Sequence, residues 1–174
     1  GVYFDRYKNR TSDKEVFGAK IIPSRGAWLE FEIDKRDVLG VRVDRKRKQS
    51  AIVFLMAIGM TKSEIAQAFK DYPLVLDALE KETLETQDEA LVDLYRKIRP
   101  ADTPTPEAGK NLLDSFYFNT KRYDLARVGR YKINRKLGVE ADFNDRSLHQ
   151  EDIIATIKYL VALHDGAATF PGKR

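Results

Sequence analysis

The spacing of apolar residues changes part-way along the chain, and this change most restricts the fold. In Trp28–Ile33, the apolar residues Leu29, Phe31 and Ile33 alternate with polar or outward-facing ones. A period of two is typical of a strand with one buried face. From Gln49 onward the apolar residues recur at helical spacing, between capping residues and prolines. Strands followed by helices predict an α+β fold, with a small antiparallel β-sheet followed by a helical bundle-like region.

The elements can be placed roughly from local signals. Glu15–Ile22 is rich in β-branched residues and stops at Pro23, and Asp34–Asp37 reads as the hairpin loop between Trp28–Ile33 and Val38–Val43. The predicted helices are Gln49–Gly59, one from Thr61 toward Phe69, Pro73–Lys81, one after Thr86, Pro106–Phe118, Asp124–Lys136, and Glu151–Asp165 capped by Ser147. The buried stripe expected in the helix after Thr86 is Leu91, Leu94, Tyr95 and Ile98.

Composition excludes several classes of protein. The 174 residues contain no cysteine, so disulfides, thiolate metal sites and cysteine nucleophiles are ruled out. The longest apolar run, Ala51–Met60, is about half of what a membrane span needs. No signal-peptide pattern opens the sequence, and we expect a reducing, cytoplasmic setting.

Signals for catalysis or metal binding are weak. The two histidines, His149 and His164, are fifteen residues apart and read as surface residues. No Gly-rich phosphate loop, GxSxG elbow or HExxH motif is present. Glu30 and Glu32 share a strand face and could hold a metal ion, but pairing with the abundant lysines and arginines is the favoured alternative. We therefore predict no catalytic residue and no metal site.

The charges fall in blocks, which the net charge of +4 hides. Residues 1–50 carry a net +5 and residues 96–136 a net +7, whereas residues 61–95 between them carry −6. Two basic blocks around an acidic one indicate a side that faces a polyanion. Ordinary helix-surface charge is the alternative.

Two features of the first block favour nucleic acid. Arg42–Lys48 has five positive residues in seven, Arg45 and Arg47 among them, which suits phosphate contacts. The alternative is a solvated sheet edge that blocks strand pairing. Trp28, the single tryptophan, follows Arg25, and an aromatic flanked by cations can stack on an unpaired base. The alternative is a tryptophan packed under a helix.

The second basic block includes Lys121–Lys136, a predicted helix with interleaved tyrosines. At helical spacing Arg127, Arg130 and Lys132 are expected to point toward a phosphate backbone. The residues expected to anchor the inner side are Leu125, Val128, Tyr131 and Ile133. A solvated basic face is the alternative. Arg96–Pro106 is a proline-rich, cation-flanked loop that could act as a gate or merely connect two helices.

Four longer motifs occur in a fixed order: IIPSRGAWLEFEIDKRD, VRVDRKRK, LYRKIRP and KRYDLARVGRYKINRKLG. At these motifs, and overall from Gly1 to about Gly166, the sequence resembles the lobe of the beta subunit of bacterial DNA-directed RNA polymerase. The short block before LYRKIRP is similar to actinobacterial versions, whereas proteobacterial relatives carry an insertion there. The resemblance divides the chain into a strand segment entering from the protrusion domain (1–22), the lobe (23–166) and a flexible tail (167–174). Since that subunit is several times longer, the chain is identified as an excised part of it.

The resemblance implies that the domain forms one wall of the DNA cleft. Trp28 matches a tryptophan that stacks on an unpaired base of the non-template strand, Asp44 and Arg45 match the adjacent pocket, and Arg122 faces the same strand. Together with the basic segments, this gives the residues expected to contact DNA: Trp28, Arg25, Asp44, Arg45, Arg47, Arg99, Arg122, Arg127 and Arg130.

The resemblance also implies a gate loop that closes over entering DNA. It comprises Arg99, Pro100, Ala101, Asp102, Thr103 and Pro104. The family usually reads RPGEPPT at this position, and here the sequence is RPADTPT. Ala101 therefore stands in place of a glycine and Asp102 in place of a glutamate, which changes the tip of the loop.

The same resemblance sets the expected chemistry and partners. The catalytic magnesium ion belongs to the beta-prime subunit, so this chain needs no cofactor and serves a nucleotidyltransferase only as part of the polymerase. The expected partners are the non-template strand, downstream duplex DNA, the other polymerase subunits and sigma factor, at the nucleoid. The alternative is a protein-docking module for transcription factors, because the block Glu64–Asp93 is acidic. A stand-alone nuclease or transferase lacks the residues it would need.

Overall fold

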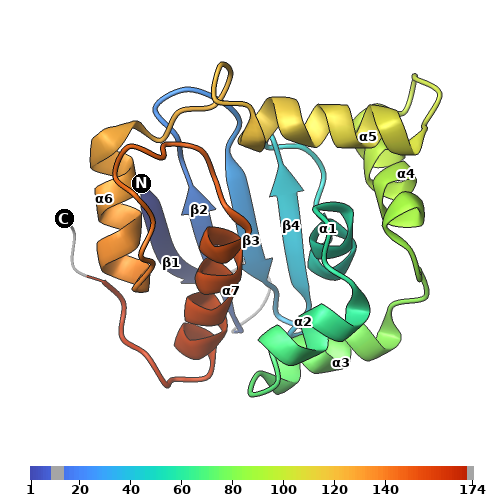
Figure 1. Ribbon diagram of the computed structural model, residues 1–174. Helices are drawn as coiled ribbons and strands as arrows, with labels where there is room; N and C mark the ends of the chain where they lie inside the picture. The colour runs from blue at the N-terminus through green and yellow to red at the C-terminus, as the bar shows by residue number, and fades with distance from the viewer. Residues whose placement is uncertain (9–13, 172–174) are drawn as a thin grey trace.

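Five strands form one antiparallel sheet in chain order in the computed structural model, which describes residues 1–8 and 14–171 (Figure 1). The strands are β1 (Val2–Lys8), β2 (Glu15–Ile21), β3 (Leu29–Ile33), β4 (Leu39–Val43) and β5 (Gln49–Ser50). The predicted β3–β4 hairpin is confirmed. Asp34 closes its loop by accepting hydrogen bonds from the amides of Arg36 (2.8 Å) and Val38 (3.0 Å).

Helices make up most of the chain after the sheet, which confirms the α+β class. They are α1 (Ala51–Ala57), α2 (Lys62–Ala68), α3 (Pro73–Lys81), α4 (Gln87–Ile98), α5 (Pro106–Leu113), the π-helical turn η1 (Asp114–Phe118), α6 (Ala126–Leu137) and α7 (Gln150–His164). The predicted capping box at Thr61 is present, since its hydroxyl accepts from the Glu64 amide (3.1 Å) and the Glu64 carboxylate accepts from the Thr61 amide (3.0 Å).

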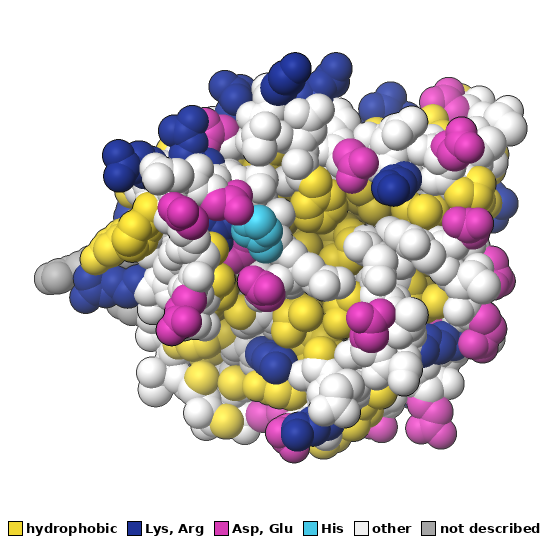
Figure 2. All heavy atoms as spheres, in the orientation of Figure 1, with side chains coloured by type: hydrophobic (Ala, Val, Ile, Leu, Met, Phe, Trp, Pro, Cys, Tyr) yellow, Lys and Arg dark blue, Asp and Glu magenta, His cyan; other side chains and the backbone are white. Residues whose placement is uncertain are grey.

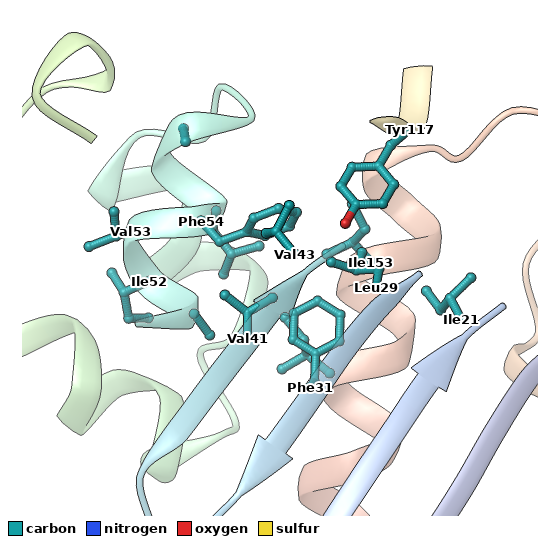
Figure 3. Close-up of a cluster of buried hydrophobic side chains, with 14 of the residues drawn as sticks. Ile21, Leu29, Phe31, Val41, Val43, Ile52, Val53, Phe54, Tyr117 and Ile153 are labelled. Carbon is teal, nitrogen blue, oxygen red and sulfur yellow. The ribbon is translucent and has the colours of Figure 1, made fainter. Parts of the chain in front are cut away.

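The core lies between one face of the sheet and the helices that cover it (Figure 1). Side chains from β2, β3 and β4 meet side chains from α1, η1 and α7 (Figure 3). Each of the labelled side chains is at most 3% exposed, namely Ile21, Leu29, Phe31, Val41, Val43, Ile52, Val53, Phe54, Tyr117 and Ile153. Full burial of one such side chain contributes roughly 1.5–3 kcal/mol, so this cluster fixes the orientation of the sheet beneath the helices.

The opposite face of the sheet is polar, as the alternation in β3 predicts. Glu32 accepts a hydrogen bond from the Tyr7 hydroxyl (2.8 Å) and pairs with the Lys48 ammonium (3.0 Å). Burial and the neighbouring Glu32 carboxylate raise the pKa of Tyr7 to about 12. Glu32 is thus engaged in charge pairing, the alternative that the sequence favoured over metal binding.

Helix α6 is rotated relative to the prediction. Leu125 and Ile133 are buried as expected, but Val128 is 62% and Tyr131 47% exposed. Arg130, predicted on the outer side, is fully buried. The reason is a polar partner inside: the buried carboxylate of Asp152 on α7 pairs with this guanidinium, so the inner face is chosen by charge pairing as well as by apolar residues.

Element boundaries differ in smaller ways. Gln49 and Ser50 pair with β4 instead of starting the first helix. His149 is the N-cap of α7 instead of Ser147, and its amide donates to the Asp152 carboxylate (2.8 Å). Tyr95, predicted in the buried stripe of α4, is half-buried.

The described part of the C-terminal segment packs on the domain. The Tyr159 hydroxyl donates to the Thr169 carbonyl (2.6 Å), and the ring of Phe170 stacks 6.3 Å from that of Phe17. Residues 172–174 of the predicted flexible tail lie outside the described residues. Among the residues described, no single helix is long and apolar enough to cross a membrane, although α1 and α2, bent by 116°, pass that test together.

Candidate nucleic-acid interface

One end of the sheet brings Trp28 next to Asp44. The strand register places Leu29 between Ile21 and Val43, so the residue before β3 and the residue after β4 emerge side by side. The Asp44 amide donates a hydrogen bond to the Trp28 carbonyl (3.1 Å). In Figure 1 this end is the upper edge of the sheet.

Arg45 covers the ring of Trp28. Its guanidinium carbon lies 4.5 Å from the ring centroid, and the tryptophan is half-buried. Asp44 and Arg45 have φ of +53° and +61°, in a turn closed by the Lys46 amide and the Val43 carbonyl (3.1 Å). Left-handed backbone at non-glycine residues costs about 1–3 kcal/mol each. The fold therefore holds a strained turn that places a cation on an aromatic face.

A buried tyrosine hydrogen-bonds to the backbone on both sides of this site. The Tyr117 hydroxyl donates to the Trp28 carbonyl (2.8 Å) and accepts from the Asp44 amide (3.3 Å). Burial holds the pKa of Tyr117 well above its usual value, so the hydroxyl stays protonated and remains a donor. Sequence reasoning missed Tyr117, because 89 residues separate it from Trp28 and no local pattern links the two.

A second contact brings Arg25 and Arg122 to the same edge. The backbones of Arg25 and Asp124 exchange two hydrogen bonds of 2.8 and 3.1 Å. Gly26 (φ +124°) permits this approach, since a Cβ there would lie 2.7 Å from the ring of Tyr123. Both arginines are exposed. Five of the predicted DNA-contacting residues thus come from three separate segments to one end of the sheet.

Three other residues predicted to contact DNA, Arg47, Arg127 and Arg99, lie outside this group of five. Arg47 and Arg127 are exposed, and neither makes a salt bridge among the described residues. Figure 2 shows lysine and arginine side chains gathered along the upper edge of the molecule. Arg99 ends α4, and the loop of residues 99–104 leads from there into α5, on the side of the molecule opposite α6 (Figure 1).

Arg130 requires a correction. Its guanidinium makes a two-pronged ion pair with Asp152 (2.8 and 2.9 Å) and donates to the carbonyls of Ser147 (2.6 Å) and Asp145 (2.8 Å). The residue is fully buried, so it cannot reach a phosphate on the surface. It instead ties α6 to α7 and to the segment between them.

The side chains at this edge have the chemistry of a binding surface. Within the described part of the chain, no group of three or more histidine, aspartate or glutamate side chains could hold a metal ion. His164 is engaged by Asp37 (2.9 Å) and Asp165 (2.8 Å). What the edge does offer is an aromatic ring under a cation, flanked by further arginines, which can stack on a base and neutralise phosphates.

Comparison with known proteins gives the family. The model of RNA polymerase Rpb2, domain 2, matches residues 1–170. The chain belongs to this family. Over its whole length it is 96% identical to a DNA-directed RNA polymerase subunit beta of Bifidobacterium longum subsp. infantis, 88% to that of Bifidobacterium adolescentis and 59% to that of Leifsonia xyli subsp. xyli.

The Rpb2 domain 2 assignment confirms the resemblance seen in the motifs. It also confirms that the chain corresponds to a part of a longer subunit, since it spans 15% of the length of these relatives. The relatives named here are actinobacterial beta subunits, as the short block before LYRKIRP predicts.

Proposed function

We propose that this domain is a wall of the DNA cleft of bacterial RNA polymerase, where it contacts the non-template strand and downstream duplex during transcription. In the assembled enzyme it would act beside the other polymerase subunits and sigma factor. The nucleotidyl transfer itself, with its magnesium ion, would take place on other parts of the enzyme. The relatives are named as subunits of that enzyme, and the domain shares its family with them.

The observation that carries the proposal is the pair of Trp28 and Arg45. The planar guanidinium, 4.5 Å from the ring centroid of the half-buried indole, forms with it a positively charged stacking platform at the surface. An unpaired base can stack on this platform while nearby arginines bind its phosphates. Arg25 and Arg122, both exposed on the same edge, are the arginines placed to bind these phosphates.

Fluorescence of Trp28 tests the proposal directly, because it is the single tryptophan. Titration with a short single-stranded DNA at low salt is expected to quench it. Trp28→Ala is expected to weaken binding by about 1–3 kcal/mol, the range for loss of one base–aromatic stack. The binding of this variant can be followed by anisotropy of labelled DNA.

Tyr131→Ala is the matched control, since it removes another exposed aromatic residue that lies on α6. It should leave DNA affinity unchanged. Equal affinity in Trp28→Ala and the unaltered chain, with no quenching in the latter, would rule out the stacking role.

Docking of a protein partner is a second candidate, favoured by a separate observation. The helices α2–α4 and the turns between them carry exposed carboxylates without a salt bridge among the described residues, at Asp71, Asp77, Glu80 and Asp88. Such a surface repels DNA and suits a basic segment of a transcription factor. Partner binding in a pull-down that persists in the Arg45→Ala/Arg47→Ala variant would support this role.

A further inference from the structure

The loop of residues 99–104 is anchored firmly at both ends. Helices α4 and α5 approach closely at Gly109, where a Cβ would lie 2.7 Å from the Leu91 carbonyl oxygen. Arg99 ends α4 with its amide bonded to the Tyr95 carbonyl (2.8 Å), and the Thr105 hydroxyl caps α5 by accepting from the Ala108 amide (3.0 Å). The backbone is thus held at both ends of the loop, and the conformation of the residues between these ends, together with the direction of the exposed Arg99 side chain, depends on further contacts.

One side chain reaches from the helix to that tip. The Tyr95 hydroxyl donates to the Asp102 carboxylate at 2.9 Å, across seven residues of chain. The Asp102 amide in turn donates to the Arg99 carbonyl (3.1 Å), which closes a turn at the tip. The Asp102 carboxylate raises the pKa of Tyr95, so the hydroxyl remains a donor at neutral pH.

Tyr95 lies at the margin of the core. Its neighbours Leu91, Leu94 and Ile98 fill the buried stripe of α4, while the Tyr95 ring is only half-buried and its hydroxyl points to the loop. The hydroxyl of Tyr95 is thus placed to contact the loop. The positive charge of the exposed Arg99 acts to lower the pKa of Tyr95, against the stronger effect of Asp102, and the Arg99 carbonyl accepts from the Asp102 amide, so the three residues are linked.

We propose that Tyr95 is a positioning residue that holds the loop of residues 99–104 in one conformation through Asp102, and thereby fixes how Arg99 is presented to DNA. This inference rests on the proposed function only in its last clause. The positioning of the loop by the hydrogen bond can be tested independently of DNA.

Hydrogen exchange in the polymerase assembled with the full-length beta subunit tests the positioning. The loop amides of Ala101, Asp102 and Thr103 can be followed, since Pro100 and Pro104 have none. Tyr95→Phe removes one hydroxyl and is expected to speed their exchange about 2- to 10-fold, which corresponds to one hydrogen bond. Asp102→Ala should give the same increase, and the double variant no further increase.

Two controls separate the hydrogen bond from general disturbance. Tyr3→Phe removes another hydroxyl from an exposed ring, one with no hydrogen bond among the described residues, and should leave loop exchange unchanged. Asp102→Asn keeps an acceptor oxygen and should retain most of the protection. Unchanged exchange in Tyr95→Phe would overturn the inference, whatever happens to DNA binding.

The rate of stable complex formation with promoter DNA tests the presentation of Arg99. Tyr95→Phe and Asp102→Ala should alter this rate by the same factor, and Arg99→Ala should alter it at least as much. If Arg99→Ala changes the rate and the other two variants do not, the positioning role is overturned while the proposed function survives. If exchange rises in Tyr95→Phe but Arg99→Ala leaves the rate unchanged, the DNA role of this loop fails and the positioning of the loop is supported.

Discussion

At the scale of single residues, the described interior contains an ion pair, Arg130 with Asp152, whose hydrogen bonds explain its burial. The Arg130 guanidinium, fully enclosed, bonds to both oxygens of Asp152 and to two backbone carbonyls. A buried charge is costly unless it is paired and hydrogen-bonded. With the Asn134 side-chain oxygen as a further acceptor (3.3 Å), every N–H on the Arg130 side chain is hydrogen-bonded, so the pair acts as a polar staple between α6 and α7.

Removal of one partner should therefore be severe. Arg130→Met leaves the Asp152 carboxylate buried without its counter-charge, which is expected to lower the free energy of unfolding by about 3–5 kcal/mol. Chemical denaturation monitored by circular dichroism measures this loss. Arg127→Met, the same change at an exposed position of α6, should stay within about 0.5 kcal/mol of the unaltered chain. Equal free energies of unfolding for the two variants would contradict a stabilising role of the Arg130–Asp152 pair.

At the scale of elements, the candidate interface depends on two loops that meet. Arg25 and Asp124 pair through their backbones. Gly26 allows this contact because it has no Cβ, and a Cβ there would collide with the Tyr123 ring. Neither loop contains a regular strand or helix at this point. This bridge, together with the hydrogen bond from the Ser24 amide to the Asp124 carbonyl (2.9 Å), sets the position of Arg25 relative to Arg122.

Gly26→Ala should disturb that bridge. The added Cβ would lie 2.7 Å from a Tyr123 ring atom, and φ of +124° is unfavourable for any residue with a side chain. We expect a loss of stability of at least about 1 kcal/mol, together with weaker DNA binding. Gly138→Ala also places alanine at a positive φ, but nothing lies within 4 Å of its Cβ, so it should lose stability and keep DNA affinity.

Another pair of elements is linked by a titratable group. His164 at the end of α7 bonds to Asp165 beside it and to Asp37 of the β3–β4 loop. Burial works to lower the pKa of His164, but hydrogen bonds and charge from the two aspartates outweigh it, and the pKa is raised. A raised pKa in the folded state means that the protonated histidine stabilises the fold.

The stability should therefore depend on pH in a defined direction. The contribution of His164 is fully present below the unfolded-state pKa of about 6.5 and is lost as the pH rises through the higher folded-state value. Denaturation across this window should show falling stability in the unaltered chain. Asp37→Asn should weaken the dependence and His164→Gln should remove this part of it. The reverse slope would show that the link does not form.

At the scale of the whole molecule, charge is segregated by surface. In Figure 2 lysine and arginine side chains gather along the upper edge and carboxylates are frequent on the right, where α4 lies in Figure 1, although both kinds of charge also occur elsewhere on this face. The two basic sequence blocks meet because the segment before α6 folds back onto the start of β3. The net charge of +4 is therefore an average over basic and acidic regions, and it does not predict the charge of either region.

Salt dependence should report this arrangement. For single strands the slope of log affinity against log salt concentration falls by about 0.7 for each phosphate contact removed. Arg122→Ala should reduce the slope by about that amount. Lys158→Ala removes an equal charge from α7, where the ammonium lies against Phe69 and Tyr72 near α2, and should leave the slope unchanged. If both variants reduced the slope equally, the salt dependence would reflect the net charge of the domain and not a phosphate contact at Arg122.

Local signals were sufficient for most of the elements. The alternation around Leu29–Ile33, the loop chemistry of Asp34 and the capping box at Thr61 predict strands, hairpin and helix starts, because each depends on neighbours within a few residues. The orientation of α6 could not be predicted in this way. Val128 and Tyr131 look like core residues, but the deciding partner of Arg130 lies on another helix.

The amino-acid sequence by itself determined the α+β class, the family and the identity of Trp28, Arg45 and Arg122 as candidates for DNA contact. Only the tertiary structure decided which candidates meet at one edge, which of them is buried, and that Tyr117 supports Trp28. The physical reason is range. Periodicity, capping and motif order act between neighbours in the chain, whereas burial and ion pairing depend on segments that approach only after the sheet and helices have packed.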